Sequence, residues 1–164
     1  HRYYFDWSRY KKAAQNAESP YTSAVSLMYA LDESLAMMEE EGKEARFERH
    51  RLMRAMVREG LRALGFTLFV EDRWASPTLT AATGGGVDPE ALRKAVRKKT
   101  GVTFAGGQGD LKGKIFRIGH MGAATPLDMV TTLAAVEMGL AELGAPVAWG
   151  RGAGRALEVW KSWQ

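Results

Sequence analysis

Hydrophobic residues recur at helical spacing in two long stretches of the first half of the chain. In the first stretch they lie four, four and three positions apart, at Leu27, Leu31, Leu35 and Met38. A second run of the same kind extends from about residue 44 to residue 64. Gly42 and Gly65 follow the two runs, and glycine commonly ends a helix. The pattern therefore predicts two consecutive amphipathic helices.

Four short runs of β-type residues predict strands, at residues 66–70, 79–83, 102–105 and 115–118. The turn-forming pair Ser76-Pro77 separates the first two, and the polar, glycine-rich segment 106–110 separates the last two as a loop. Few short strands alternating with helices favour an α+β domain. We expect a small mixed or antiparallel sheet of about four strands with helices packed on one face.

Three more helices are predicted, at residues 88–100, 125–143 and 155–163. Asp88 is a good cap residue before Pro89, and Thr125 has Asp128 three residues later, as in a capping box. The helix from Thr125 is apolar on nearly all sides. Such a helix needs burial on two sides, so we expect a partner outside this small domain to cover one of them.

The composition is that of an ordinary soluble domain, with 164 residues, 46% of them hydrophobic and 26% charged. The absence of cysteine excludes disulfides, a thiol nucleophile, thiolate-bound zinc and cysteine-ligated iron–sulfur centres within this segment. No apolar stretch reaches the length of a membrane span, and no signal peptide is recognisable at the amino terminus. We therefore expect a cytoplasmic protein without a membrane partner.

Two groups of basic residues raise the question of nucleic-acid binding. One is a stripe along the second helix, formed by Arg51, Arg54, Arg58 and Arg62, and the other is the run 93–99. Charges of this kind usually lie on solvated helix faces, and neither group belongs to a recognised nucleic-acid module. The net charge of +4 is also mild. We expect no nucleic-acid partner.

Arg117 and His120 are the polar residues of interest in the second half. Arg117 lies between two apolar residues on a predicted strand, so it is expected to face inward or into a cleft, where its charge needs a partner. That partner is either an internal acid or the carboxylate of a ligand, which a guanidinium binds through two parallel hydrogen bonds. His120 is interpreted as a turn or packing residue, and no second histidine stands at metal-ligand spacing.

Hydroxyl groups gather in residues 19–23, where the first long helix begins. Free N–H groups and the helix dipole favour an anion at such an end. The alternative is that Thr22 or Ser23 only caps the helix.

Four blocks of sequence together resemble the carboxy-terminal part of class V aminotransferases, most closely the alanine–glyoxylate and serine–pyruvate branch: residues 3–7, 19–27, 106–109 and 113–122. Members of this family are pyridoxal-phosphate enzymes of the aspartate aminotransferase fold, fold type I. The resemblance implies that residues 1–22 leave a large domain that precedes this segment. Residues 23–164 then form the small carboxy-terminal domain together with its long linking helix.

The resemblance also assigns roles to individual residues. Arg117 matches the arginine that binds the substrate α-carboxylate. Thr22 matches a threonine that reaches the cofactor phosphate of the neighbouring subunit in a homodimer. Tyr21 is expected to replace a phosphate-contacting tyrosine of some members, whose own position is Ser19 here. The residues implied at the substrate entrance are Gly106, Gly107 and Gln108.

The family implies transfer of an amino group between a small amino acid of the alanine, serine or aspartate type and a 2-oxo acid such as glyoxylate or pyruvate. The lysine that forms the Schiff base precedes residues 3–7 in the family, and neither Lys11 nor Lys12 matches it. We therefore expect no catalytic residue in this segment and no activity of this chain alone. The alternative is a non-catalytic subunit or interaction module of the same fold, since some relatives are described as small subunits of a soluble hydrogenase.

Overall fold

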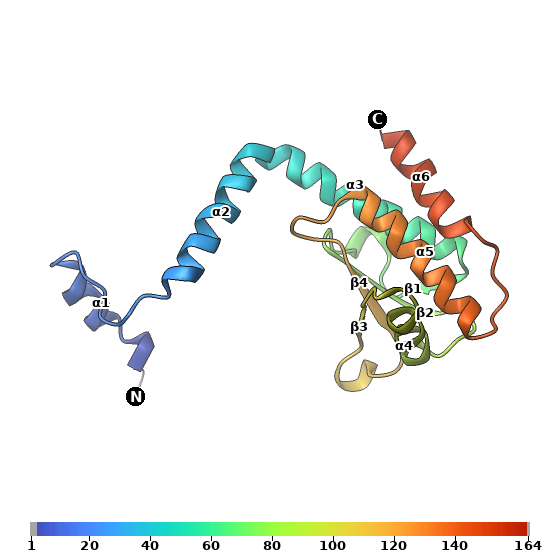
Figure 1. Ribbon diagram of the computed structural model, residues 1–164, viewed down its shortest axis with the longest axis horizontal. Coiled ribbons are helices and arrows are strands. Elements are labelled where there is room, and N and C mark those ends of the chain that lie inside the picture. The colour runs from blue at the N-terminus through green and yellow to red at the C-terminus, as the bar shows by residue number, and fades with distance from the viewer. Residues whose placement is uncertain (1–2, 164) are drawn as a thin grey trace. The chain divides into compact units, whose positions relative to one another are not determined.

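A computed structural model describes residues 3–163, and the chain divides between residues 43 and 44 into two units (Figure 1). The first unit contains a short 3₁₀ helix, Tyr3–Phe5, followed by helices α1, Trp7–Ala14, and α2, Val25–Glu41. Helix α1 was not expected from the hydrophobic pattern. It begins because the Asp6 carboxylate accepts hydrogen bonds from the Ser8 amide at 3.1 Å and the Ser8 hydroxyl at 2.5 Å.

Helix α2 confirms that the first predicted helix exists, and it ends at Gly42, whose φ of 80° suits glycine. Its N-cap is Ala24, and no side chain caps the first turn. The interpretation of Thr22 or Ser23 as the helix cap is therefore wrong. No side chain of α2 is buried.

The second unit contains a sheet and four longer helices. Its helices and strands are α3, Lys43–Ala63; β1, Phe66–Leu68; β2, Leu79–Gly84; α4, Pro89–Thr100; β3, Ala105–Gly106; β4, Phe116–Gly119; α5, Pro126–Glu142; and α6, Arg151–Trp163. The four strands follow the order β1-β2-β4-β3, and every neighbouring pair is antiparallel. The predicted α+β class is confirmed, and the sheet is antiparallel throughout.

Several predicted boundaries differ from the structure, most of all those of β3 and α6. The strand expected at 102–105 is reduced to the two residues of β3, so that Gly106 lies in a strand instead of the loop. Helix α6 begins four residues before the expected start, at Arg151. Its first turn contains Gly152, which weakens the helix signal in the sequence. The buried Glu137 of α5 compensates, because its carboxylate accepts the Gly152 amide at 2.8 Å and the Gly150 amide at 2.6 Å.

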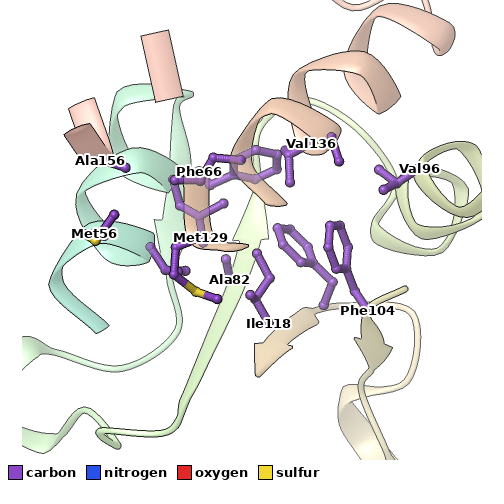
Figure 2. Packing of buried hydrophobic residues seen from close by; sticks show 14 of the residues in the cluster. Met56, Phe66, Ala82, Val96, Phe104, Ile118, Met129, Val136 and Ala156 are labelled. Atoms are coloured by element: carbon purple, nitrogen blue, oxygen red, sulfur yellow. The ribbon is translucent and has the colours of Figure 1, made fainter. Parts of the chain in front are cut away.

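The hydrophobic core lies between one face of the sheet and the helices of the second unit. Alternate strand residues, among them Phe66, Ala82 and Ile118, are buried on this face. Side chains of α3, α4, α5 and α6 converge on it, as Met56, Val96, Val136 and Ala156 do in Figure 2. The opposite face of the sheet carries none of these core side chains, and it holds Arg117.

Helix α5 packs between α4 and α6 of the same chain. Its Gly139 lies so close to Val96 of α4 that a Cβ atom at this position would collide with the valine side chain. These two helices cover part of α5, whereas its apolar residues Leu127 and Met138 are exposed. The expectation of a partner outside this domain stays a prediction.

The arginine stripe of α3 is only partly a solvated face, since Arg51 and Arg62 are exposed but Arg58 is not. Arg58 is buried and donates to the Asp72 carboxylate at 2.6 Å. It also donates to the backbone carbonyl of Val70, the first residue of the segment 70–75, at 2.7 Å. Arg62 also donates to Asp72, at 2.7 Å, and Arg54 donates to the last carbonyl of the segment at 3.3 Å. Burial raises the pKa of Asp72, but the two guanidinium groups outweigh this effect and hold it below its usual value. These arginines fix the connection between β1 and β2.

Candidate functional site

Arg117 lies in the middle of β4 on the face of the sheet that turns away from the helices. Its neighbours along the strand, Phe116 and Ile118, point into the core, so the alternation of the strand sends Arg117 the other way. The residues directly across from it are Ala81 on β2 and Ala105 on β3. Because both are small, the half-buried guanidinium is not covered from either side.

Within the described part of the second unit, residues 44–163, the Arg117 guanidinium has one protein partner. Its Nε donates to the carbonyl of Gly106 at 2.8 Å, and no carboxylate of this unit lies within ion-pair distance. No acid of the second unit is thus the ion-pair partner of Arg117. The two terminal nitrogens of the guanidinium remain able to donate hydrogen bonds, and the distance between them matches the distance between two carboxylate oxygens.

The segment after β3 is held close to the hairpin that carries Arg117. The Gly107 amide donates to the Ile115 carbonyl at 3.2 Å, and a Cβ atom on Gly107 would collide with the carbonyl of Leu111. Glycine is required here because the backbone turns back on itself. The next residue, Gln108, is exposed and precedes the short 3₁₀ helix Gly109–Leu111. The loop thus presents Gln108 at a fixed place near the strand of Arg117.

His120 is a buried packing residue, as interpreted from the sequence. Its ring accepts or donates at both nitrogens: Nε2 lies 2.9 Å from the Thr80 hydroxyl and Nδ1 lies 3.0 Å from the Pro77 carbonyl. Since a carbonyl only accepts, Nδ1 carries the proton and Nε2 accepts from Thr80. Burial lowers the pKa of His120 to about 4. The ring is therefore neutral, and its two hydrogen bonds connect the start of β2 to the end of β4. Alternation along β2 predicts that Thr80 lies on the buried face, but nothing in the sequence pairs it with His120.

Thr22 and Tyr21 belong to the first unit. Thr22 is exposed, and its hydroxyl has no hydrogen-bond partner among residues 3–163. Tyr21 packs against Tyr3 and Tyr4, with ring centroids 4.8 and 4.7 Å away, and its hydroxyl donates to the Tyr3 carbonyl. The structure thus leaves the Thr22 hydroxyl available to a ligand, whereas the Tyr21 proton is used within the protein. Thr22 and Arg117 lie in different units.

Some classes of site are not found in the part of the chain that the structure describes. No cluster of three or more histidine, aspartate or glutamate side chains there could hold a metal ion. None of the described helices combines the length and the apolar character that crossing a membrane would require. Lys11 and Lys12 are both exposed on α1.

The chain is similar to several known proteins over most of its length. No family model matches it. It is 41% identical over 143 residues to a protein named soluble hydrogenase, small subunit, of a Synechococcus species, which covers 87% of this chain and 37% of that protein. It is 40% identical over 156 residues to the pyridoxamine–pyruvate transaminase of Mesorhizobium japonicum, covering 93% of this chain and 38% of the transaminase.

The solved structures agree with the sequence matches. The crystal structure of ureidoglycine–glyoxylate aminotransferase from Bacillus subtilis superposes with a TM-score of 0.88 and 34% identity, over 96% of this chain and 42% of the enzyme. The chain thus spans well under half of the length of the relatives that it matches. These transaminases are class V aminotransferases, and the chain is homologous to a carboxy-terminal segment of them.

Proposed function

We propose that the chain serves as the carboxy-terminal, substrate-binding segment of a pyridoxal-phosphate-dependent aminotransferase. In this proposal the whole protein transfers an amino group between a small amino acid of the alanine, serine or aspartate type and a 2-oxo acid such as glyoxylate or pyruvate. The names of the relatives support the reaction type, since each names a transaminase together with an amino compound and a 2-oxo acid. The remaining two thirds of such a protein would supply the lysine that holds the cofactor.

One observation carries the proposal: the unpaired edge of the Arg117 guanidinium on the open face of the sheet. Burying part of an arginine that has no protein carboxylate beside it costs free energy unless an anion pairs with the charge. An amino acid and a 2-oxo acid share one group, the α-carboxylate, and its two oxygens match the two terminal nitrogens. Arg117 therefore binds both substrates of the reaction in one orientation.

The other expected site residues have supporting roles in the proposal. Thr22 stands ahead of a helix whose first turn has no side-chain cap, so its hydroxyl and the positive end of the helix dipole suit a phosphate. We assign it to the cofactor phosphate of the partner subunit in a homodimer. Gly106, Gly107 and Gln108 border the substrate entrance. Bound pyridoxal phosphate would supply the electron sink of the reaction, while this chain orients the substrate.

The test uses the full-length protein that contains this chain. Purified with pyridoxal phosphate, it should convert glyoxylate to glycine with alanine or serine as donor, measured through the 2-oxo acid formed. Arg117→Ala should lower kcat/KM about 100-fold, because a charge-assisted bidentate pair contributes roughly 3 kcal/mol. Lys114→Ala is the matched control, since Lys114 is an exposed cation on the same hairpin. Unchanged kinetics of the Arg117 variant would contradict its assignment.

The alternative is a non-catalytic subunit of the same fold. It is suggested by the relative named as a small subunit of a soluble hydrogenase. A folded full-length protein that binds no pyridoxal phosphate and transfers no amino group would favour this alternative. We also expect the chain of residues 1–164 to be inactive by itself, which the same assay on the isolated chain checks directly.

A further inference from the structure

Two arginines bind backbone carbonyls at the short edge strand β3, one in the strand and one on the residue just before it. Arg117 Nε donates to the Gly106 carbonyl at 2.8 Å, and Arg93 Nε donates to the Phe104 carbonyl, also at 2.8 Å. Carbonyls two residues apart in an extended chain point in the same direction. Arg117 comes from the open face of the sheet, whereas Arg93 comes from helix α4. The two side chains therefore fix the same edge from different elements.

The Arg93 side chain is itself held in place. Its Nη1 donates to both carboxylate oxygens of Glu90, at 2.8 and 2.7 Å. This pair packs directly beneath Gly106: a Cβ atom there would lie 2.5 Å from Glu90 Oε1 and 2.7 Å from Arg93 Nη1. A larger residue at this position would displace the Glu90 and Arg93 side chains. The Gly106 backbone thus packs directly against the Arg93–Glu90 ion pair.

The strand has few other contacts to hold it. β3 contains only two residues, and β4 is its single neighbour in the sheet. The Gly107 amide donates to the Ile115 carbonyl, so the alternation of an antiparallel pair turns the Gly106 carbonyl away from β4. That carbonyl is the acceptor for Arg117. Its position depends on the edge of β3, which the Arg93–Glu90 pair secures.

We propose that Arg93, held by Glu90, is a positioning residue for Arg117. It fixes the Gly106 carbonyl, which occupies Arg117 Nε and leaves only the edge of the two terminal nitrogens for a ligand. A substrate carboxylate then binds end-on, in one orientation. This inference rests on the proposed function for its kinetic consequence, but the coupling of Arg93 to Arg117 belongs to the chain itself.

The coupling is tested first in the chain alone by NMR. With ¹⁵N-labelled arginine, the Arg117 Nε proton is identified by its loss in Arg117→Lys, and its exchange with water is measured. Arg93→Met should speed this exchange about tenfold, because the acceptor is no longer held. Arg97→Met is the matched control, one turn further along α4 and exposed, and should leave the exchange unchanged. Equal exchange in the wild type and the Arg93 variant would overturn the proposal.

A second variant keeps the test decisive if Arg93→Met does not fold. Arg93→Lys retains the charge but cannot reach Glu90 and the Phe104 carbonyl together, so it should also speed the exchange of Arg117 Nε. Circular dichroism verifies the fold of each variant. Unchanged exchange in a folded Arg93→Lys protein counts against the coupling in the same way.

The kinetic test uses the full-length protein loaded with pyridoxal phosphate. Aminooxyacetate and methoxyamine both react with the cofactor carbonyl, but only aminooxyacetate carries a carboxylate. Arg93→Met should slow the reaction of aminooxyacetate about tenfold and leave that of methoxyamine unchanged within about twofold. Equal slowing of both reagents would show a structural role only. If neither reagent reacts with the wild type, the proposed function fails, while the NMR result still decides whether Arg93 positions Arg117.

Discussion

His120 makes the stability of the protein depend on pH. Its buried ring is neutral, with Nδ1 donating to Pro77 and Nε2 accepting from Thr80. Burial lowers its pKa to about 4 in the folded chain, whereas the unfolded chain has the ordinary value of about 6.5. Between these values the unfolded chain binds more protons than the folded one. The contribution of His120 is therefore complete above pH 6.5 and is lost as the pH falls toward 4.

The size of the effect follows from the two pKa values. Proton linkage gives a loss of about 2 kcal/mol in the free energy of unfolding between pH 7 and pH 5, and about 3 kcal/mol by pH 4. Carboxylates titrate mostly below pH 5, so the interval from 7 to 5 isolates the histidine. His120→Gln keeps an acceptor for the Thr80 hydroxyl and cannot titrate. We expect the variant to be less stable at pH 7 but to lose most of the pH dependence.

Urea denaturation followed by circular dichroism at pH 7, 6 and 5 measures the free energy of unfolding of both proteins. An NMR titration of the His120 imidazole gives its pKa directly. His50→Gln serves as a control for the other buried histidine, which donates to a backbone carbonyl within its own helix. The reasoning would be refuted by identical pH slopes in the wild type and His120→Gln, or by a His120 ring that titrates near 6.5.

Three further predictions concern stability and are checked by urea denaturation at pH 7. Arg58→Ala should lower the free energy of unfolding by about 2 kcal/mol. Arg51→Ala, which removes an exposed ion pair on the same stripe, should lower it by less than about 0.5 kcal/mol. Equal losses would contradict the role of buried Arg58 in holding the segment 70–75. Glu137→Ala should cost about 2 kcal/mol, because the backbone amides at the start of α6 lose their acceptor, and an unaffected protein would exclude this capping role. Gly139→Ala should cost about 2 kcal/mol through collision with Val96, and a neutral result would mean that α4 and α5 separate at little cost.

Local signals in the sequence predicted most of the secondary structure. The capping box of Thr125 and Asp128 is present as expected, and so are the Asp88 cap and the long helices. These features depend on residues within a few positions of one another, which is why they can be read from the chain directly. Helix α1 was missed; it has only eight residues and begins at a single cap residue, Asp6.

Contacts between distant residues could not be predicted in this way. The arginine stripe of α3 has the appearance of a solvated face, but the segment 70–75 folds back onto Arg58. The apolar helix α5 needs burial on more than one side, and α4 and α6 of the same chain supply part of it. In both cases the sequence shows that a surface needs a contact, while the tertiary structure determines which segment supplies it.

The sequence by itself determined the α+β class, the order of the helices and strands, and the resemblance that singles out Arg117 and Thr22. It left open whether Arg117 faces an internal acid or an external carboxylate. Only the tertiary structure decided that no acid of the second unit, within residues 44–163, reaches this arginine, and that the Gly106 carbonyl occupies its Nε. The physical reason is that strand alternation fixes the face on which a side chain lies, whereas its partners depend on which strands pair beside it.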